Sequence, residues 1–161
     1  MDARKCISYL TIELRGSIPK ELREPMGNHV FGCDICQDVC PWNRRAAASP
    51  LVEFQPRALP RHREKASEAA SQAEEDSLFI PQLDWLLTLS QEDFRRVFRG
   101  SPLTRAKWRG LVRNACIAAG NSGIRPGGAS YARILVSLQK LAACDDAIVA
   151  ESAQWALSRI Q

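Results

Sequence analysis

Three closely spaced cysteines followed by a proline constrain this chain more than any other feature. Cys33, Cys36 and Cys40 have the spacing C-x2-C-x3-C-P, with Pro41 directly after the last cysteine. This is the second half of the bacterial iron–sulfur motif C-x2-C-x2-C-x3-C-P, whose last cysteine ligates the other cluster of a two-cluster protein. The spacing therefore predicts iron–sulfur chemistry and indicates that some ligands lie outside the motif.

Cys6 is the next candidate ligand. A [4Fe–4S] cluster takes four thiolates, because sulfur donors suit iron and each iron takes one protein ligand. Cys6, Cys33 and Cys36 make three ligands for one cluster, while the motif assigns Cys40 to another. Neither cluster is complete from these residues, so the count predicts a chain that begins within a two-cluster module.

Two other interpretations of the cysteines are a zinc site and a disulfide framework. Zinc accepts four thiolates, or three thiolates and an imidazole, so the motif could be completed by Cys6 or His29. The C-x3-C-P ending is less usual for zinc. Disulfides are disfavoured, because the charged start of the chain is no signal peptide and clustered cysteines in a reducing cytosol are usually metal ligands.

Composition divides the chain into three regions. Residues 1–45 hold the clustered cysteines, residues 46–77 form a polar, alanine-rich stretch that predicts a linker, and residues 78–161 have helical apolar spacing. No stretch has the apolar length needed to cross a membrane, so we expect a cytoplasmic protein. The formal charge of +4 is too small to indicate a nucleic-acid partner by itself.

The carboxy-terminal region predicts stacked helices. Ser90 begins a capping-box pattern, Gly100 and Gly127-Gly128 are helix breaks, and Asp145 or Asp146 caps the last helix. Helix pairs that cannot cover their own apolar faces stack as in HEAT-type repeats. The predicted fold is therefore mainly α: half of a bacterial-type two-[4Fe-4S] ferredoxin module followed by HEAT-like α-helical repeats.

Basic residues concentrate at the start of one predicted helix. Seven basic and two acidic residues lie between Glu92 and Arg113. Arg105, Arg109 and Arg113 are spaced i, i+4 and i+8, so they share a face if one helix carries all three. A solvated helix face explains them, but like charges also repel one another, and a phosphate backbone would relieve that repulsion. The spacing alone leaves both interpretations open.

Several segments together resemble epoxyqueuosine reductases. They are Cys6 through Glu13, Gly16 through Pro19, Gly32 through Asn43, Phe98 through Pro102, Arg113 through Ala115, Ala119 through Asn121, and Trp155 through Leu157. The resemblance covers nearly the whole chain and is weakest in the charged linker. It is most specific at the Cys6 string and the Cys-Pro-Trp-Asn ending of the cysteine motif.

This resemblance implies an activity and its cofactors. Such enzymes reduce epoxyqueuosine to queuosine at the wobble position of the tRNA anticodon, with a cobalamin and two [4Fe–4S] clusters that relay electrons to the cobalt. By resemblance, Cys6, Cys33 and Cys36 ligate one cluster together with an upstream cysteine, and Cys40 ligates the other. Ser8 and Asp34 would lie near the cobalamin, although hydrogen bonding within the cluster loop explains them equally well.

The resemblance also assigns the helical repeats to the tRNA anticodon arm. The implied phosphate contacts are Arg105, Arg109, Arg113 and Asn114. The family's cobalamin domain, its first cysteine motif and its acidic proton donor precede the matching segments, so no catalytic residue is assigned. We expect a carboxy-terminal fragment that is inactive alone, either monomeric or completed in trans, with an unknown electron donor. The alternative is a stand-alone electron-transfer or metal-stabilised binding module.

Overall fold

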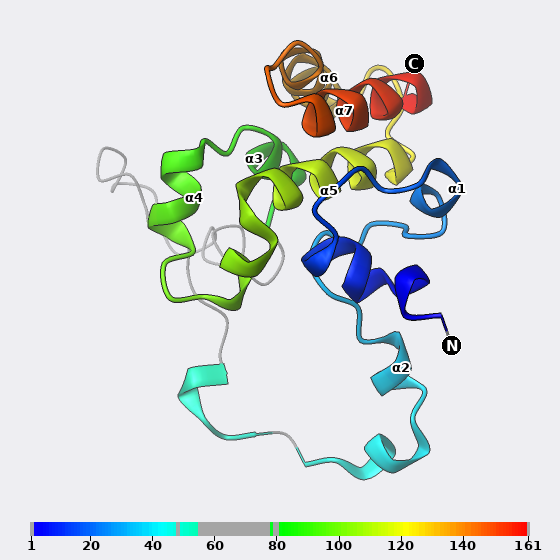
Figure 1. Cartoon of the computed structure of the whole chain (residues 1–161), viewed down its shortest axis with the longest axis vertical. Coiled ribbons are helices and arrows are strands. Elements are labelled where there is room, and N and C mark those ends of the chain that lie inside the picture. The colour runs from blue at the N-terminus through cyan, green and yellow to red at the C-terminus, as the bar shows by residue number, and fades with distance from the viewer. Residues whose placement is uncertain (1, 48, 55–77, 79–80, 161) are drawn as a thin grey trace. The chain divides into compact units, whose positions relative to one another are not determined.

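The computed structural model describes residues 2–47, 49–54, 78 and 81–160 (Figure 1). The regular secondary structure of this part of the chain is helical and includes no strand, which confirms the predicted mainly α fold. The chain divides into two units, one made of Met1–Cys33 with Leu83–Gln161 and the other of Asp34–Gln82. The boundaries predicted at residues 45 and 77 therefore do not coincide with this division. Most of the predicted linker lies outside the described residues.

The amino-terminal part of the first unit consists of short helical turns. They are the 3-10 turn η1 (Ala3–Lys5), the π-helix η2 (Tyr9–Glu13) and α1 (Lys20–Arg23). The wide turn of η2 ends where the N–H of Leu14 donates to the carbonyl of Tyr9 at 3.0 Å. Single π turns are rare and occur frequently at functional sites. The alternating apolar residues of this stretch thus form a helix and not a strand.

A small hydrophobic cluster joins this amino-terminal part to the long helix α5 (Lys107–Asn121). Leu10, Ile18 and Met26 are each at most 2% exposed and pack with Ile117 of α5. Apolar area removed from water favours association, so the cluster holds the Cys6 segment against the helical part of the unit.

The remaining elements of the first unit are α3 (Leu83–Leu87), α4 (Gln91–Val97), the 3-10 helix η5 (Pro102–Ala106), α5, α6 (Ala129–Ala142) and α7 (Ala147–Ile160). Three of them, those that follow Ser90, Gly128 and Asp146, begin where the sequence predicts. Ser90 caps α4, its Oγ accepting from the N–H of Asp93 at 3.0 Å. Asp146 caps α7, accepting from the N–H groups of Ile148 and Val149 at 3.2 and 3.3 Å. Of the two aspartates considered, Asp146 is therefore the cap.

Helix α5 is the central element of this unit. It packs against α7 and α3, and α6 packs against α7 and α3 (Figure 1). Gly120 of α5 allows the approach of α7, because a Cβ there would lie 2.6 Å from the ring of Trp155 and 3.1 Å from the Cα of Ala156. A HEAT-type repeat remains a prediction. Among the described residues, no helix has both the length and the apolar character that crossing a bilayer requires.

The second unit is described in its cysteine-bearing part and a short following turn. It contains α2 (Ile35–Asp38), the 3-10 helix η3 (Pro41–Arg45) and the 3-10 turn η4 (Val52–Phe54). Pro41 occupies the first position of η3, where the missing N–H of proline costs nothing. Trp42 is 91% exposed.

Candidate iron–sulfur segment and basic pocket

The four predicted ligands are free thiols. In the first unit Cys6 and Cys33 are half-buried, and in the second unit Cys36 is exposed and Cys40 half-buried. Accessible thiols without a disulfide partner are the donors that iron–sulfur clusters use, so the donor chemistry fits. Within the described ranges, no three histidine, cysteine, aspartate or glutamate side chains lie close enough to hold one metal ion. The described residues therefore offer the thiol donors that a cluster needs.

Hydrogen bonds hold the backbone next to Cys33. The hydroxyl of Ser8 donates to the carbonyl of Cys33 at 3.3 Å, and the N–H of Gly32 donates to Oγ1 of Thr11 at 3.0 Å. Gly32 has a φ of +75°, which glycine adopts without a Cβ clash. Ser8 thus bonds within the cysteine loop, as one of its two interpretations predicts. Thr11 was not identified from sequence, because its partner lies 21 residues away.

Asp34 begins the cysteine-bearing helix of the second unit. Its side chain is exposed, and its carbonyl accepts from the N–H groups of Gln37 and Asp38 at 2.8 and 2.9 Å. Its predicted place near a cobalamin stays a prediction.

Arg113, predicted as a phosphate contact, is buried. Only 1% of it is exposed, and its guanidinium donates to the carbonyls of Leu10, Leu14 and Gly16 at 2.6, 2.8 and 2.6 Å. Burial lowers the pKa of Arg113 to about 10, which leaves it a cation at neutral pH. The guanidinium therefore binds backbone carbonyls within and after η2, and the prediction of a phosphate contact is wrong for this residue.

Asn114 is also buried and connects the two cysteine segments of the first unit. Its Nδ2 donates to the carbonyls of Thr11 and Val30, both at 2.8 Å, and its Oδ1 accepts from Nε and Nη2 of Arg113 at 3.0 and 2.9 Å. Thr11 lies in the helix after Cys6, and Val30 precedes Cys33. The predicted phosphate contact of Asn114 is therefore also wrong, and its role is to position backbone.

Asn121 makes similar contacts at the other end of α5. Its Nδ2 donates to the carbonyls of Arg23 and Gly27 at 2.7 and 2.9 Å. Arg23 in turn is 1% exposed and donates to Glu151 of α7 at 2.7 and 2.9 Å. Polar side chains of α5 thus bond to backbone along the amino-terminal part of the unit.

Arg105 and Arg109 are exposed, as a surface contact requires. Arg105 is 65% exposed and pairs with Glu13, and Arg109 is 55% exposed with its Nε 2.5 Å from Oδ2 of Asp146. Burial favours a higher pKa for Asp146, but Arg109 and two backbone N–H groups together lower it. Arg105 belongs to η5 and not to α5, because Lys107 has a φ of +60° and interrupts the helical path. The face that the three arginines were predicted to share is therefore not formed.

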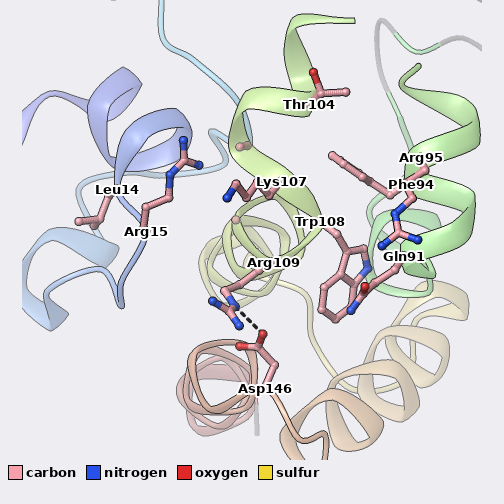
Figure 2. A pocket seen from close by; sticks show the side chains of 12 residues that line it. Leu14, Arg15, Gln91, Phe94, Arg95, Thr104, Lys107, Trp108, Arg109 and Asp146 are labelled. Carbon is pink, nitrogen blue, oxygen red and sulfur yellow. Dashed lines mark hydrogen bonds and ion pairs between the residues drawn. The ribbon is translucent and has the colours of Figure 1, made fainter. Parts of the chain in front are cut away.

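A pocket of about 510 Å³ lies at the start of α5 (Figure 2). Four cationic side chains and one carboxylate line it: Arg15, Arg95, Lys107, Arg109 and Asp146. Figure 2 shows Lys107 and Arg109 projecting toward the side where Arg15 lies, while Arg95 reaches toward Trp108 from α4. The indole N–H of Trp108 donates to the carbonyl of Leu89 at 2.6 Å. Arg15 was not identified from sequence, because it is far from the other residues along the chain.

Comparison with known proteins places these features in a family context. Residues 1–43 match the model of a 4Fe-4S double cluster binding domain. The epoxyqueuosine reductase of Pseudomonas aeruginosa is 40% identical over 159 residues, which are 99% of this chain and 37% of that protein. The epoxyqueuosine reductase of Escherichia coli is 42% identical over 122 residues, 76% of this chain and 27% of that protein. The chain thus spans about a third of the length of the first of these relatives.

Solved structures agree with the sequence comparison. A crystal structure of epoxyqueuosine reductase with a tRNA-Tyr epoxyqueuosine-modified tRNA stem loop has a TM-score of 0.71 and 28% identity, covering 96% of this chain and 34% of the other. The epoxyqueuosine reductase of Streptococcus thermophilus has a TM-score of 0.70 and 26% identity, covering 99% and 35%. Sequence and fold together confirm the predicted resemblance.

Proposed function

We propose that this chain supplies cluster ligands and a tRNA-binding surface for the reduction of epoxyqueuosine to queuosine in tRNA. In sequence and fold it corresponds to about a third of an epoxyqueuosine reductase. One observation supports this most strongly: the cysteine motif lies in residues 1–43, which match a double cluster binding domain, in a chain whose remainder also matches these reductases.

The cysteines are proposed to serve two clusters. Cys6, Cys33 and Cys36 would hold one [4Fe–4S] cluster, and Cys40 would hold the other. Two such clusters take about eight thiolates, so the remaining ligands come from outside this chain. Bound clusters supply one-electron transfer, and the residues around Cys33 keep its loop in place through Ser8 and Thr11.

Cobalamin is a proposal from the family resemblance alone. Ser8 and Asp34 would be its neighbours in this chain. The hydroxyl of Ser8 is used by the carbonyl of Cys33, and Asp34 offers one exposed carboxylate. These two residues do not form a corrin-binding site, so that cofactor would be held mainly by other protein. No step of the reaction is assigned to a residue of this chain.

The tRNA-binding role rests on exposed cations. Arg105 and Arg109 remain the proposed phosphate contacts, because their guanidinium groups reach solvent. Phosphate contacts release counterions, so binding of an anticodon stem loop should weaken steeply as salt is raised. Binding that does not depend on salt would favour the stand-alone module with a protein partner.

Metal analysis tests the cluster assignment. We expect the chain to gain iron and sulfide on anaerobic reconstitution and Cys33→Ala to gain less, because one thiolate is lost. Cys144→Ala is the matched control, since Cys144 is half-buried and separate from the motif. Equal iron and sulfide in all three proteins would contradict the assignment, and zinc without iron in protein taken directly from cells would favour the structural zinc site.

A further inference from the structure

We propose that the basic pocket binds one unstacked nucleotide of an RNA strand. The phosphodiester would lie among Arg15, Lys107 and Arg109, and the base would lie against Trp108 and the guanidinium of Arg95. This inference rests on the proposed tRNA-binding function and gives it a defined place in the chain.

The charge of the pocket favours an anion. Four cations and one carboxylate give a net charge of +3 (4 − 1) among the lining residues. Asp146 pairs with Arg109, whereas the side chains of Arg95 and Lys107 are exposed and form no hydrogen bond or ion pair within the described part of the chain. An Nη1 of Arg15 donates to the carbonyl of Arg105 at 2.6 Å, which fixes this guanidinium at the pocket. The net positive charge of these lining residues attracts a phosphate group.

The aromatic part of the pocket favours a nucleotide over a bare phosphate. Trp108 is half-buried, and the hydrogen bond of its Nε1 to the Leu89 carbonyl fixes the ring. Phe94, 5% exposed, adds apolar surface beside it. Single-stranded RNA is recognised by bases that stack on aromatic rings or on arginine guanidinium planes. A volume of about 510 Å³ is also much larger than one phosphate needs and is typical of small-molecule sites.

The backbone of Lys107 is a further independent observation. Its φ of 60° and ψ of 166° lie in a region that only glycine adopts without strain. Lys107 is the one non-glycine residue with a positive φ among those the structure describes. Strained residues persist where the strain serves a site, and here the strained residue places an ammonium group at the pocket.

Matched arginines on α4 test the proposal. Arg95 lines the pocket, whereas its neighbour Arg96 is 53% exposed, pairs with Asp93 and does not line it. The probe is a fluorescein-labelled anticodon stem loop, and its affinity for the full chain is measured by anisotropy between 50 mM and 300 mM salt. The guanidinium of Arg95 is proposed to stack on the base, and loss of base stacking lowers affinity about fivefold or more. We expect this for Arg95→Gln and a change of about twofold or less for Arg96→Gln.

Lys107→Gly separates binding from folding. Glycine relieves the strained φ and removes the ammonium group, so we expect a higher melting temperature together with an affinity lower by about fivefold. A variant that is less stable and binds normally would overturn the proposal. So would equal losses for Arg95→Gln and Arg96→Gln, because the attraction would then be diffuse.

Competition distinguishes the ligand sources. We expect short single-stranded RNA to displace the probe at concentrations where inorganic phosphate and free mononucleotides do not. Displacement by inorganic phosphate at equal concentration would overturn the nucleotide site and leave a simple anion site. A chain that gains iron and sulfide but does not bind the stem loop would overturn this inference while the cluster assignment stands.

Discussion

Replacing Asn114 by alanine tests whether α5 holds the cysteine segments through buried hydrogen bonds. Asn114→Ala removes two bonds to the carbonyls of Thr11 and Val30 and two from the guanidinium of Arg113. A buried group left without a partner costs about 1–3 kcal/mol, and bonds to charged groups lie at the upper end. Because such costs are not fully additive, we expect the free energy of unfolding to fall by about 4 kcal/mol.

Asn121→Ala is the matched control for this prediction. The side chain of Asn121 makes two hydrogen bonds, both from its Nδ2, and its Oδ1 is buried without a partner among the described residues. The same substitution on the same helix therefore removes half as many bonds, and we expect a cost of about 2 kcal/mol.

Urea denaturation followed by circular dichroism measures both variants. With an m value of about 2 kcal/mol per molar urea, the midpoint should fall by about 2 M for Asn114→Ala and about 1 M for Asn121→Ala. An unchanged m value would show that stability and not the unfolded state has changed. If Asn114→Ala shifts the midpoint no further than Asn121→Ala, the buried network around Arg113 does not stabilise the fold as we argue.

Two further predictions concern the helical part of the first unit. Gly120→Ala should destabilise the chain by about 1–3 kcal/mol, because the added Cβ would lie 2.6 Å from the Trp155 ring. Gly110→Ala is the control within the same helix. A Cβ at Gly110 would meet its nearest neighbour at 3.6 Å, so alanine should be neutral or stabilising there. Thermal melts of the two variants compare them, and equal losses would contradict the close packing. Asp146→Asn should lower the free energy of unfolding by about 1 kcal/mol at neutral pH, a value that allows for the solvent exposure of its partner Arg109. The pKa of Asp146 is lower in the folded protein than in the unfolded chain. The stability that this carboxylate contributes is therefore fully present above its unfolded pKa and is lost as pH falls through its folded pKa. The difference in free energy of unfolding between wild type and variant should therefore shrink below about pH 4. A difference that stays constant from pH 7 to pH 3 would contradict this contribution.

Local signals in the sequence predicted much of the fold. The serine that caps α4, the glycine pair before α6 and the aspartate that caps α7 act on residues within one turn, so their effects are visible in a short stretch. The cysteine spacing is equally local. The helix caps depend on neighbours in sequence, and for that reason the structure agrees with them, while the ligand role of the cysteines stays a prediction.

The errors arose where a side chain bonds far along the chain. Arg105, Arg109 and Arg113 would share a face on one continuous helix, but the positive φ of Lys107 separates the first from the other two. The backbone carbonyls that Arg113 binds lie 97 to 103 residues away, beyond the reach of any local pattern. One indication was present: Arg113 and Asn114 interrupt an otherwise apolar run from Leu111 to Ala119, and polar residues within such a run must find buried partners.

The same long-range contacts explain why the cysteine segment and the helices form one unit. Among the first 33 residues, Leu10, Ile18 and Met26 form a hydrophobic cluster that Ile117 of α5 completes. The carbonyl groups exposed by the π-helix and the following loop are satisfied by Arg113 and by the amide that follows it. A backbone polar group that is buried without a partner is costly, so this segment cannot keep its conformation when α5 is removed. We therefore infer that the matched cluster-binding stretch depends on the carboxy-terminal helices for its shape, although the two are far apart in sequence.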